Sequence, residues 1–592
     1  MRKPTMIFAG LTVAGALALA GCSTTADTST GTSDTTTTTT ETTSTTLSAT
    51  DVTERTYEQL GVKDVEIPFD EASAIDITLS DSGSTGGDGV TVDGSTVTIT
   101  EGGTYRLTGT LSAGQVIVDT DDEDVNIILD GVSITSDDTA ALDIENADEV
   151  VVWLAEGSTN SLADAADATA STDDSETDVP NATLYSTADL WIAGTGSLDV
   201  TAVANDGIAS KDGLVIEDGT ITVTAADDGI RGKDYLVIEG GDITVDADGD
   251  GLKVTNEDVV DDNGDAVGVL WMSGGTVDIT SGSDGIDVVY QATIAGGELT
   301  IAAGDDGIHS DGILAISDGT VDVTTSYEGL EGMQILLSGG TGTIVSSDDG
   351  FNATDGSGSS GTEMGGGQMP GGGTRPGRDS SSTDTSSTSS TTTGDSTAVT
   401  TAAYTTTSTT TDGATDATTV AGGMGETASE GVYLEISGGT WVIDAEGDGL
   451  DSNGTAVMTG GTVVVNGPAS SGNGALDVNG SFTVSGGTLA ASGSSGMLVA
   501  PTSDGQGVLT IAFSSQVAAG TVLTVTDTDG NVIASFTSEK TAQSLVLSSP
   551  EIVSGETYTV TADATVTGTS VGGLVVDGTA TGGTELGDLT AD

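Results

Sequence analysis

The chain has 592 residues, with 12 Lys and Arg against 92 Asp and Glu, so its formal net charge at pH 7 is −80. Such a surface repels nucleic-acid phosphate, which excludes a DNA- or RNA-binding protein. Aromatic residues make up 3% and glycines number 88, which argues against a helical globule, while 35% hydrophobic residues are too many for a wholly disordered acidic chain.

The N-terminus has the pattern of a bacterial lipoprotein signal. Residues 1–21 are predicted to be a signal peptide, in which two basic residues precede a mainly apolar stretch. The stretch ends in Leu-Ala-Gly-Cys, which matches a lipobox; the alternative is an ordinary signal peptide that happens to contain a cysteine. We therefore predict a lipid anchor at Cys22 and a location on the extracellular face of the bacterial cell membrane. Residues 22–50, almost all Thr, Ser, Asp and Gly, are predicted to be a tether.

Two sequence markers recur at the same period in the middle of the chain. The first is Asp-Gly, once Glu-Gly, followed by Ile, Leu or Phe, and its carboxylates are Asp206, Asp228, Asp250, Asp284, Asp306, Glu328, Asp349 and Asp448. The second is a glycine pair, or a near variant, with the same spacing of mostly 22 residues. Two longer steps mark insertions at residues 256–267 and 355–429. A fixed period of this length predicts a solenoid.

Short strands are predicted on both sides of each glycine pair. In triplets such as 214–216 and 221–223 the outer residues are apolar and the middle one varies, which is typical of a half-buried strand. Two or three such strands per repeat predict one coil of an all-β parallel β-helix, with coils about 4.8 Å apart. This domain, with an N-terminal cap, is predicted over residues 51–505, interrupted by the low-complexity insertion 355–429. Residues 506–592 have the sequence pattern of β-hairpins and are predicted to form a small C-terminal β cap and tail.

Stacking would place the Asp-Gly carboxylates in one column, where they repel one another unless protons or counter-ions intervene. Four basic residues supply counter-charges to the first coils: Lys211, Arg231, Lys233 and Lys253. Further along, acidic residues are doubled instead, and clustered carboxylate oxygens favour calcium. The predicted calcium ligands are Asp284, Asp287, Asp305, Asp306, Glu328, Glu331, Asp348 and Asp349. The alternative is that these carboxylates are solvated or cap turns. His309 is interpreted as a hydrogen-bonding turn residue.

Three runs of residues carry a family resemblance. They are 304–320, which contains Asp-Asp-Gly-Ile-His, 326–332, which reads Ser-Tyr-Glu-Gly-Leu-Glu-Gly, and 347–353, which reads Ser-Asp-Asp-Gly-Phe-Asn-Ala. They resemble bacterial carbohydrate-binding domain-containing proteins, and the resemblance covers most of residues 70–500. It implies a right-handed parallel β-helix related in shape to pectate lyases. It also implies a calcium-binding adhesin for cellulose and pectin-type polymers that has no lyase activity.

Candidate polysaccharide contacts fall on two faces of the predicted coils. Trp191 and Trp271 occupy the outward middle position of a strand, where they would stack on sugars unless an insertion covers them. The four basic residues would attract an anionic polymer at the Asp-Gly turns, whereas Trp441 aligns with core positions. We therefore predict a surface-anchored, non-catalytic polysaccharide-binding protein. The alternative is a uronate lyase, in which calcium neutralises the substrate carboxylate and a basic residue takes the C5 proton.

Overall fold

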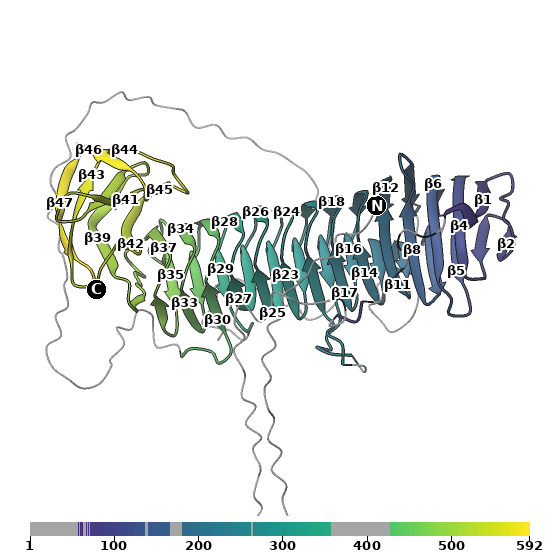
Figure 1. The fold of residues 1–592 in the computed structure, drawn as a ribbon, viewed down its shortest axis with the longest axis horizontal. Coiled ribbons are helices and arrows are strands. Elements are labelled where there is room, and N and C mark those ends of the chain that lie inside the picture. The colour runs from purple at the N-terminus through teal and green to yellow at the C-terminus, as the bar shows by residue number, and fades with distance from the viewer. Residues whose placement is uncertain are drawn as a thin grey trace, which may run out of the picture. The chain divides into compact units, whose positions relative to one another are not determined.

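The computed structural model describes residues 57, 60–62, 65, 67, 69, 71–136, 140–165, 180–261, 264–356 and 427–592, all within the compact unit Thr45–Asp592. These residues are almost entirely β-structure, which confirms the predicted all-β class (Figure 1). Helix is nearly absent from them: η2 (Glu71–Ser73) is a single 3-10 turn, and no helix of the described residues is long and apolar enough to cross a membrane. The predicted signal peptide, Cys22, the tether and residues 357–426 of the predicted insertion lie outside the described residues.

The N-terminal part of the sheet lacks a clean sequence period but is built from the same short strands. A hairpin joins β2 to β3, and the other strand pairs among β1 to β9 are parallel. The strands are β1 (Ile75–Ser80), β2 (Val90–Asp93), β3 (Thr96–Ile99), β4 (Gly103–Leu111), β5 (Gln115–Asp119), β6 (Val125–Thr135), β7 (Leu142–Asn146), β8 (Glu149–Leu154) and β9 (Thr159–Ala163).

The periodic part contributes two or three strands to each repeat. They are β10 (Ala182–Ser186), β11 (Asp189–Gly194), β12 (Ser197–Ala202), β13 (Asp206–Ser210), β14 (Gly213–Ile216), β15 (Thr220–Ala225), β16 (Ile230–Gly232), β17 (Tyr235–Ile238), β18 (Asp242–Ala247), β19 (Leu252–Val254), β20 (Val269–Met272), β21 (Thr276–Ser281), β22 (Ile286–Val288), β23 (Gln291–Ile294), β24 (Glu298–Ala302), β25 (Ile308–Ile316), β26 (Thr320–Thr325), β27 (Leu330–Leu337), β28 (Thr341–Ser346), β29 (Phe351–Ala353), β30 (Tyr433–Ile436), β31 (Thr440–Ala445), β32 (Leu450–Ser452), β33 (Thr455–Met458), β34 (Thr462–Asn466), β35 (Leu476–Val478), β36 (Phe482–Val484) and β37 (Thr488–Gly493).

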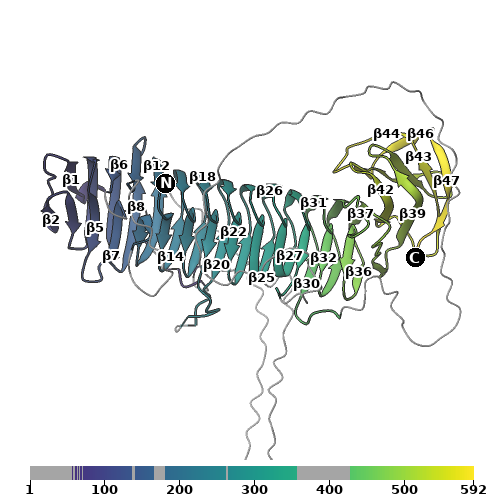
Figure 2. The ribbon, with the colours of Figure 1, turned by 180° about the vertical axis from the view of Figure 1, so that it is seen from behind.

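Successive repeats pair in parallel at the sequence period. Leu214 of β14 lies opposite Leu236 of β17, and Thr220 of β15 opposite Asp242 of β18, each 22 residues further on. The same register continues across both insertions, since Tyr235 pairs with Val269 and Gln334 pairs with Tyr433. Figure 1 and, from behind, Figure 2 show the strands of neighbouring repeats side by side. Each sequence position therefore forms a column of side chains that runs through the repeats.

Small apolar side chains fill the interior of the repeats. Burial alternates along strands such as β15, where Ile221 and Val223 point inward and the threonines between them are exposed. One apolar cluster of this kind extends from Ile77 to Val546. Trp441 is fully buried in it, edge-to-face with Phe351 at 6.1 Å between ring centroids, which confirms its predicted core position.

The C-terminal strands pair in a different way. Antiparallel pairs join β42 to β37 of the last repeat and to β39, and a separate five-stranded sheet has the order β45-β41-β40-β43-β47. The expected hairpin is present between β40 and β41. The strands are β38 (Thr502–Ser503), β39 (Val508–Val517), β40 (Val522–Thr526), β41 (Val532–Thr537), β42 (Ala542–Ser548), β43 (Thr557–Ala562), β44 (Thr565–Thr567), β45 (Leu574–Val575), β46 (Thr579–Thr581) and β47 (Thr584–Thr590).

Candidate functional site

The Asp-Gly turns form a ladder of hydrogen bonds between repeats. In six steps of the column the backbone N–H of one turn carboxylate residue donates to a side-chain oxygen of the residue before it in the column. The donor and acceptor pairs are Asp228 to Asp206 at 3.3 Å, Asp250 to Asp228 at 3.0 Å, Asp284 to Asp250 at 2.9 Å, Asp306 to Asp284 at 2.8 Å, Glu328 to Asp306 at 3.1 Å and Asp448 to Asp349 at 2.6 Å. We call this column the carboxylate ladder.

The glycine of each Asp-Gly pair is required by close packing. A Cβ at Gly229 would collide with Cγ1 of Val245 and would lie 2.6 Å from the carbonyl oxygen of Gly251. The backbone of each turn therefore lies directly against the core and against the backbone of the next turn. This explains the dipeptide in structural terms: the aspartate accepts a hydrogen bond from the next repeat, and the glycine lets the two backbones approach.

A second column, three residues after each turn carboxylate, carries the counter-charges. It contains Arg231, Lys253, Asp287, His309, Glu331, Asn352 and Asp451 in successive repeats. At its start, Nη2 of Arg231 lies 2.5 Å from Oδ2 of Asp206, and both side chains are at most 6% exposed. One repeat on, Nζ of Lys253 lies 2.5 Å from Oδ2 of Asp250 and 3.5 Å from Oδ2 of Asp228.

These contacts place Arg231 and Lys253, two of the four predicted basic residues, differently from residues of an open polymer-binding surface. Arg231 is buried against the ladder, and Lys253 is bound by carboxylates on three sides, including Asp287 at 3.6 Å. Lys211 is half-buried and Lys233 is exposed. Burial lowers the pKa of Lys253, but the surrounding carboxylates outweigh it and raise that pKa above its ordinary value. Both Arg231 and Lys253 therefore neutralise the ladder.

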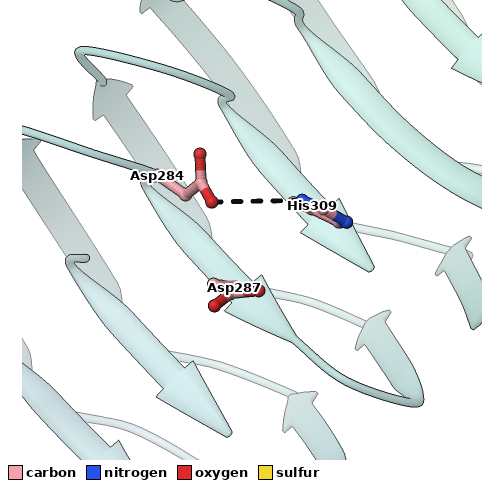
Figure 3. A group of neighbouring side chains, drawn as sticks. All are labelled: Asp284, Asp287 and His309. Atoms are coloured by element: carbon pink, nitrogen blue, oxygen red, sulfur yellow. Dashed lines mark ion pairs between the residues drawn. The ribbon is translucent and has the colours of Figure 1, made fainter. Parts of the chain in front are cut away.

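His309 holds the same position of the second column in the middle repeats. Its Nδ1 lies 3.9 Å from Oδ2 of Asp306 and 4.0 Å from both Oδ2 of Asp284 and Oε2 of Glu331 (Figure 3 shows the Asp284 side). Ligand atoms within 4.8 Å of one another form three overlapping groups among the described residues: Asp284 with Asp287 and His309, Asp306 with His309 and Glu331, and Asp284 with Asp305 and Asp306. We call these residues the acidic cluster.

The acidic cluster contains five of the eight predicted calcium ligands. The other three lie outside these groups: Glu328 accepts a hydrogen bond from Nδ2 of Asn352 at 2.6 Å, and Asp348 and Asp349 belong to the following turn. Sequence reasoning treated His309 as a turn residue and missed its central position. Its spacing of 22 residues from both Asp287 and Glu331 was the available signal.

The carboxyl groups in and beyond the acidic cluster are strongly perturbed. Burial is the largest cause in each case, and neighbouring carboxylates add to it. The pKa of Asp284 rises to about 7, those of Glu328, Glu331 and Asp349 to about 8, and that of Asp451 to about 8. The column positions after His309 are Glu331, Asn352 and Asp451, so the sequence supplies no basic side chain there. A bound cation would relieve this repulsion.

The predicted tryptophan face is covered in this structure. Trp191 and Trp271 lie in one column with Val215 and Val237, as the period predicts. Trp191 is only 5% exposed and Trp271 is half-buried, because the ring of Tyr57 packs edge-to-face against both, at 6.2 and 6.1 Å between centroids. Neither ring is presented as an open platform for sugars.

Comparisons with known proteins identify the family. A family model described as "Carbohydrate-binding domain-containing protein" matches residues 93–370. A protein of the bacterium Acetivibrio thermocellus with the same description is 42% identical over 226 residues, covering 38% of this chain and 77% of that protein. A solved structure titled "Structure of the polysaccharide lyase-like protein from C. thermocellum, Gadolinium derivative" is 33% identical, covers 41% of this chain and 96% of its own, and has a TM-score of 0.38. The chain therefore belongs to the carbohydrate-binding domain-containing proteins.

Proposed function

We propose that this protein is a lipid-anchored, surface-exposed polysaccharide-binding protein that uses calcium and carries out no catalysis. The parallel columns would wind as a right-handed β-helix, with the acidic cluster on the edge formed by the Asp-Gly turns. Carbohydrate binding is supported by the family. The observation that carries the calcium proposal is the group of Asp284, Asp305 and Asp306, whose ligand oxygens approach within 4.8 Å without a basic residue among them.

The donor chemistry of this group fits calcium. Calcium takes several oxygen ligands in a flexible arrangement, and carboxylates supply one or two oxygens each. The carboxylate ladder occupies Oδ1 of Asp284 and Oδ1 of Asp306. Oδ2 of each, which lies 3.9 to 4.0 Å from Nδ1 of His309, would contact a cation together with the carboxylate of Asp305. Calcium held there would neutralise the repulsion and would attract a polymer carboxylate, as pectin-type chains provide.

The basic residues favour binding over lyase chemistry. A lyase needs an uncharged base that can take a proton from the substrate, and such a base has a lowered pKa. The carboxylates around Lys253 have the opposite effect, and the guanidinium of Arg231 is buried 2.5 Å from Asp206. Both side chains are thus engaged in neutralising the ladder, which supports the non-catalytic interpretation.

A pull-down on covalently cross-linked pectate beads, in calcium and in EDTA, tests the proposal. The variant Asp305→Asn/Asp306→Asn removes two charges but keeps an amide oxygen at position 306 for the ladder hydrogen bond. The matched control, Asp318→Asn/Asp322→Asn, removes two charges whose Oδ1 atoms also accept backbone N–H groups, at 2.8 and 3.0 Å. We expect the wild type and the control to bind only when calcium is present, and the cluster variant to lose binding. Equal binding in EDTA and in calcium would contradict the proposal.

A further inference from the structure

An open groove of about 590 Å³ follows the other corner of the repeats, where the glycine pairs turn the chain. It crosses β15, β18, β21 and β24 and is distinct from the acidic cluster. We propose that this groove binds an uncharged linear glycan, laid along the column direction. The inference rests on the proposed carbohydrate-binding function and assigns it a second site, which needs no calcium.

One wall of the groove alternates hydroxyl and carboxylate groups. Thr220, Asp242, Thr276 and Glu298 hold the same position in four consecutive repeats and line the groove. Neighbouring members are one strand spacing apart, about 4.8 Å. An extended β-1,4-linked glycan advances by about this distance per sugar, so every second sugar meets the same kind of group. Carboxylates accept hydrogen bonds from sugar hydroxyls, and threonine hydroxyls both donate and accept them.

The floor of the groove is formed by the second glycines of the glycine pairs. It contains Gly219, Gly241 and Gly275, whose φ values of +125°, +92° and +85° favour residues without a side chain. Their carbonyl oxygens already accept the N–H groups of the next repeat at 2.8 to 2.9 Å. These carbonyl oxygens are therefore already engaged, and the hydrogen bonds to a ligand fall to the side chains of the wall.

The charge of the groove selects the class of ligand. Its titratable lining groups are Asp218, Asp242 and Glu298, with no basic residue, so an anionic polymer is repelled. A shared cation is also disfavoured, because Asp242 and Glu298 are two strand spacings apart, roughly 10 Å. Neither residue belongs to a group of metal-ligating side chains among the described residues. An uncharged ligand with many hydroxyl groups is not repelled by these carboxylates and needs no shared cation.

Titration calorimetry with cellohexaose in EDTA tests this site. The groove variant Asp242→Ala/Glu298→Ala removes two exposed carboxylates from the lining. The control Asp246→Ala/Asp278→Ala removes two exposed carboxylates from β18 and β21 outside the groove. We expect the wild type and the control to bind with equal affinity and the groove variant to bind at least about tenfold more weakly, since two charge-assisted hydrogen bonds are lost.

Three results would overturn the inference: no binding of cellohexaose by the wild type, equal loss in both variants, or displacement of the glycan by calcium. Pectate binding in calcium separates this inference from the proposed function. The groove variant should keep calcium-dependent pectate binding. If pectate binding fails in the wild type while cellohexaose still binds, the calcium proposal is wrong and the inferred glycan site in the groove is still supported.

Discussion

Replacing Asp284 by Asn tests the electrostatics of the acidic cluster. Asp284 belongs to two of the three candidate metal-ligating groups, and its side chain is 14% exposed. Its Oδ1 accepts the N–H of Asp306 at 2.8 Å, and an asparagine oxygen can accept the same bond. The substitution therefore removes the titratable charge and one potential calcium ligand while it preserves the ladder.

The expected magnitude follows from the raised pKa. Burial is the main cause, the Asp306 hydrogen bond opposes it, neighbouring carboxylates reinforce it, and the pKa of Asp284 becomes about 7 instead of 3.8. A carboxyl whose pKa is higher in the folded state favours folding only while it is protonated. Its contribution is complete below about pH 4 and is lost as the pH rises through about 7. At 1.36 kcal/mol per pKa unit the loss is at most about 4 kcal/mol.

Urea unfolding between pH 4 and pH 8, with EDTA or with calcium, measures these effects. In EDTA the wild type should lose stability toward pH 8, and Asp284→Asn should lose less. Calcium should restore the wild type at pH 8, by about 2.7 kcal/mol at a hundredfold excess over Kd, and should restore the variant less. Asp278→Asn, at an exposed position of β21, should behave as the wild type. A variant with the wild-type pH profile and the wild-type response to calcium would refute the reasoning.

Three further outcomes are expected. Arg231→Met should lower the free energy of unfolding by about 3–5 kcal/mol in urea titrations, because it leaves the buried carboxylate of Asp206 without its counter-charge, and a loss below about 1 kcal/mol would contradict the buried pair. Trp441→Ala should cost about 3–5 kcal/mol in the same assay without changing pectate binding by the folded fraction, since the ring is fully buried. Incubation with pectate should give no rise in ultraviolet absorbance from unsaturated uronates. A steady rise that disappears in Lys253→Ala would establish a lyase instead.

The sequence period predicted much of the described architecture. Two markers at one spacing indicated which residues share a column, and the pairing of Leu214 with Leu236 follows that spacing. The longer steps were correctly interpreted as insertions, because the register resumes where Tyr235 pairs with Val269. Periodicity succeeds here because parallel pairing between repeats converts a sequence offset directly into a neighbour in space.

The sequence period could not predict contacts between residues that are far apart in the chain. The strand pattern placed Trp191 in an outward column, yet Tyr57, more than a hundred residues earlier, packs on its ring. The period also carried no information about which side-chain atom faces which. Arg231 was predicted both as a counter-charge to the Asp-Gly column and as a polymer contact. Its guanidinium lies 2.5 Å from Asp206, which confirms the first role, and it is buried there rather than exposed to a polymer. The covering of Trp191 and the orientation of Arg231 therefore both depend on tertiary packing.

The carboxylate ladder explains why one residue type serves two roles in this column. One oxygen of each aspartate accepts a backbone N–H of the next repeat, a task that asparagine would also perform. The other oxygen carries the charge, and its partner changes along the column from Arg231 to Lys253 and then to His309. An asparagine column would stack equally well but would offer a cation neutral amide oxygens in place of charged carboxylates. After Lys253 burial raises the carboxyl pKa values to about 7 and 8, so near neutral pH either a proton or the proposed calcium ion would relieve the repulsion between these groups.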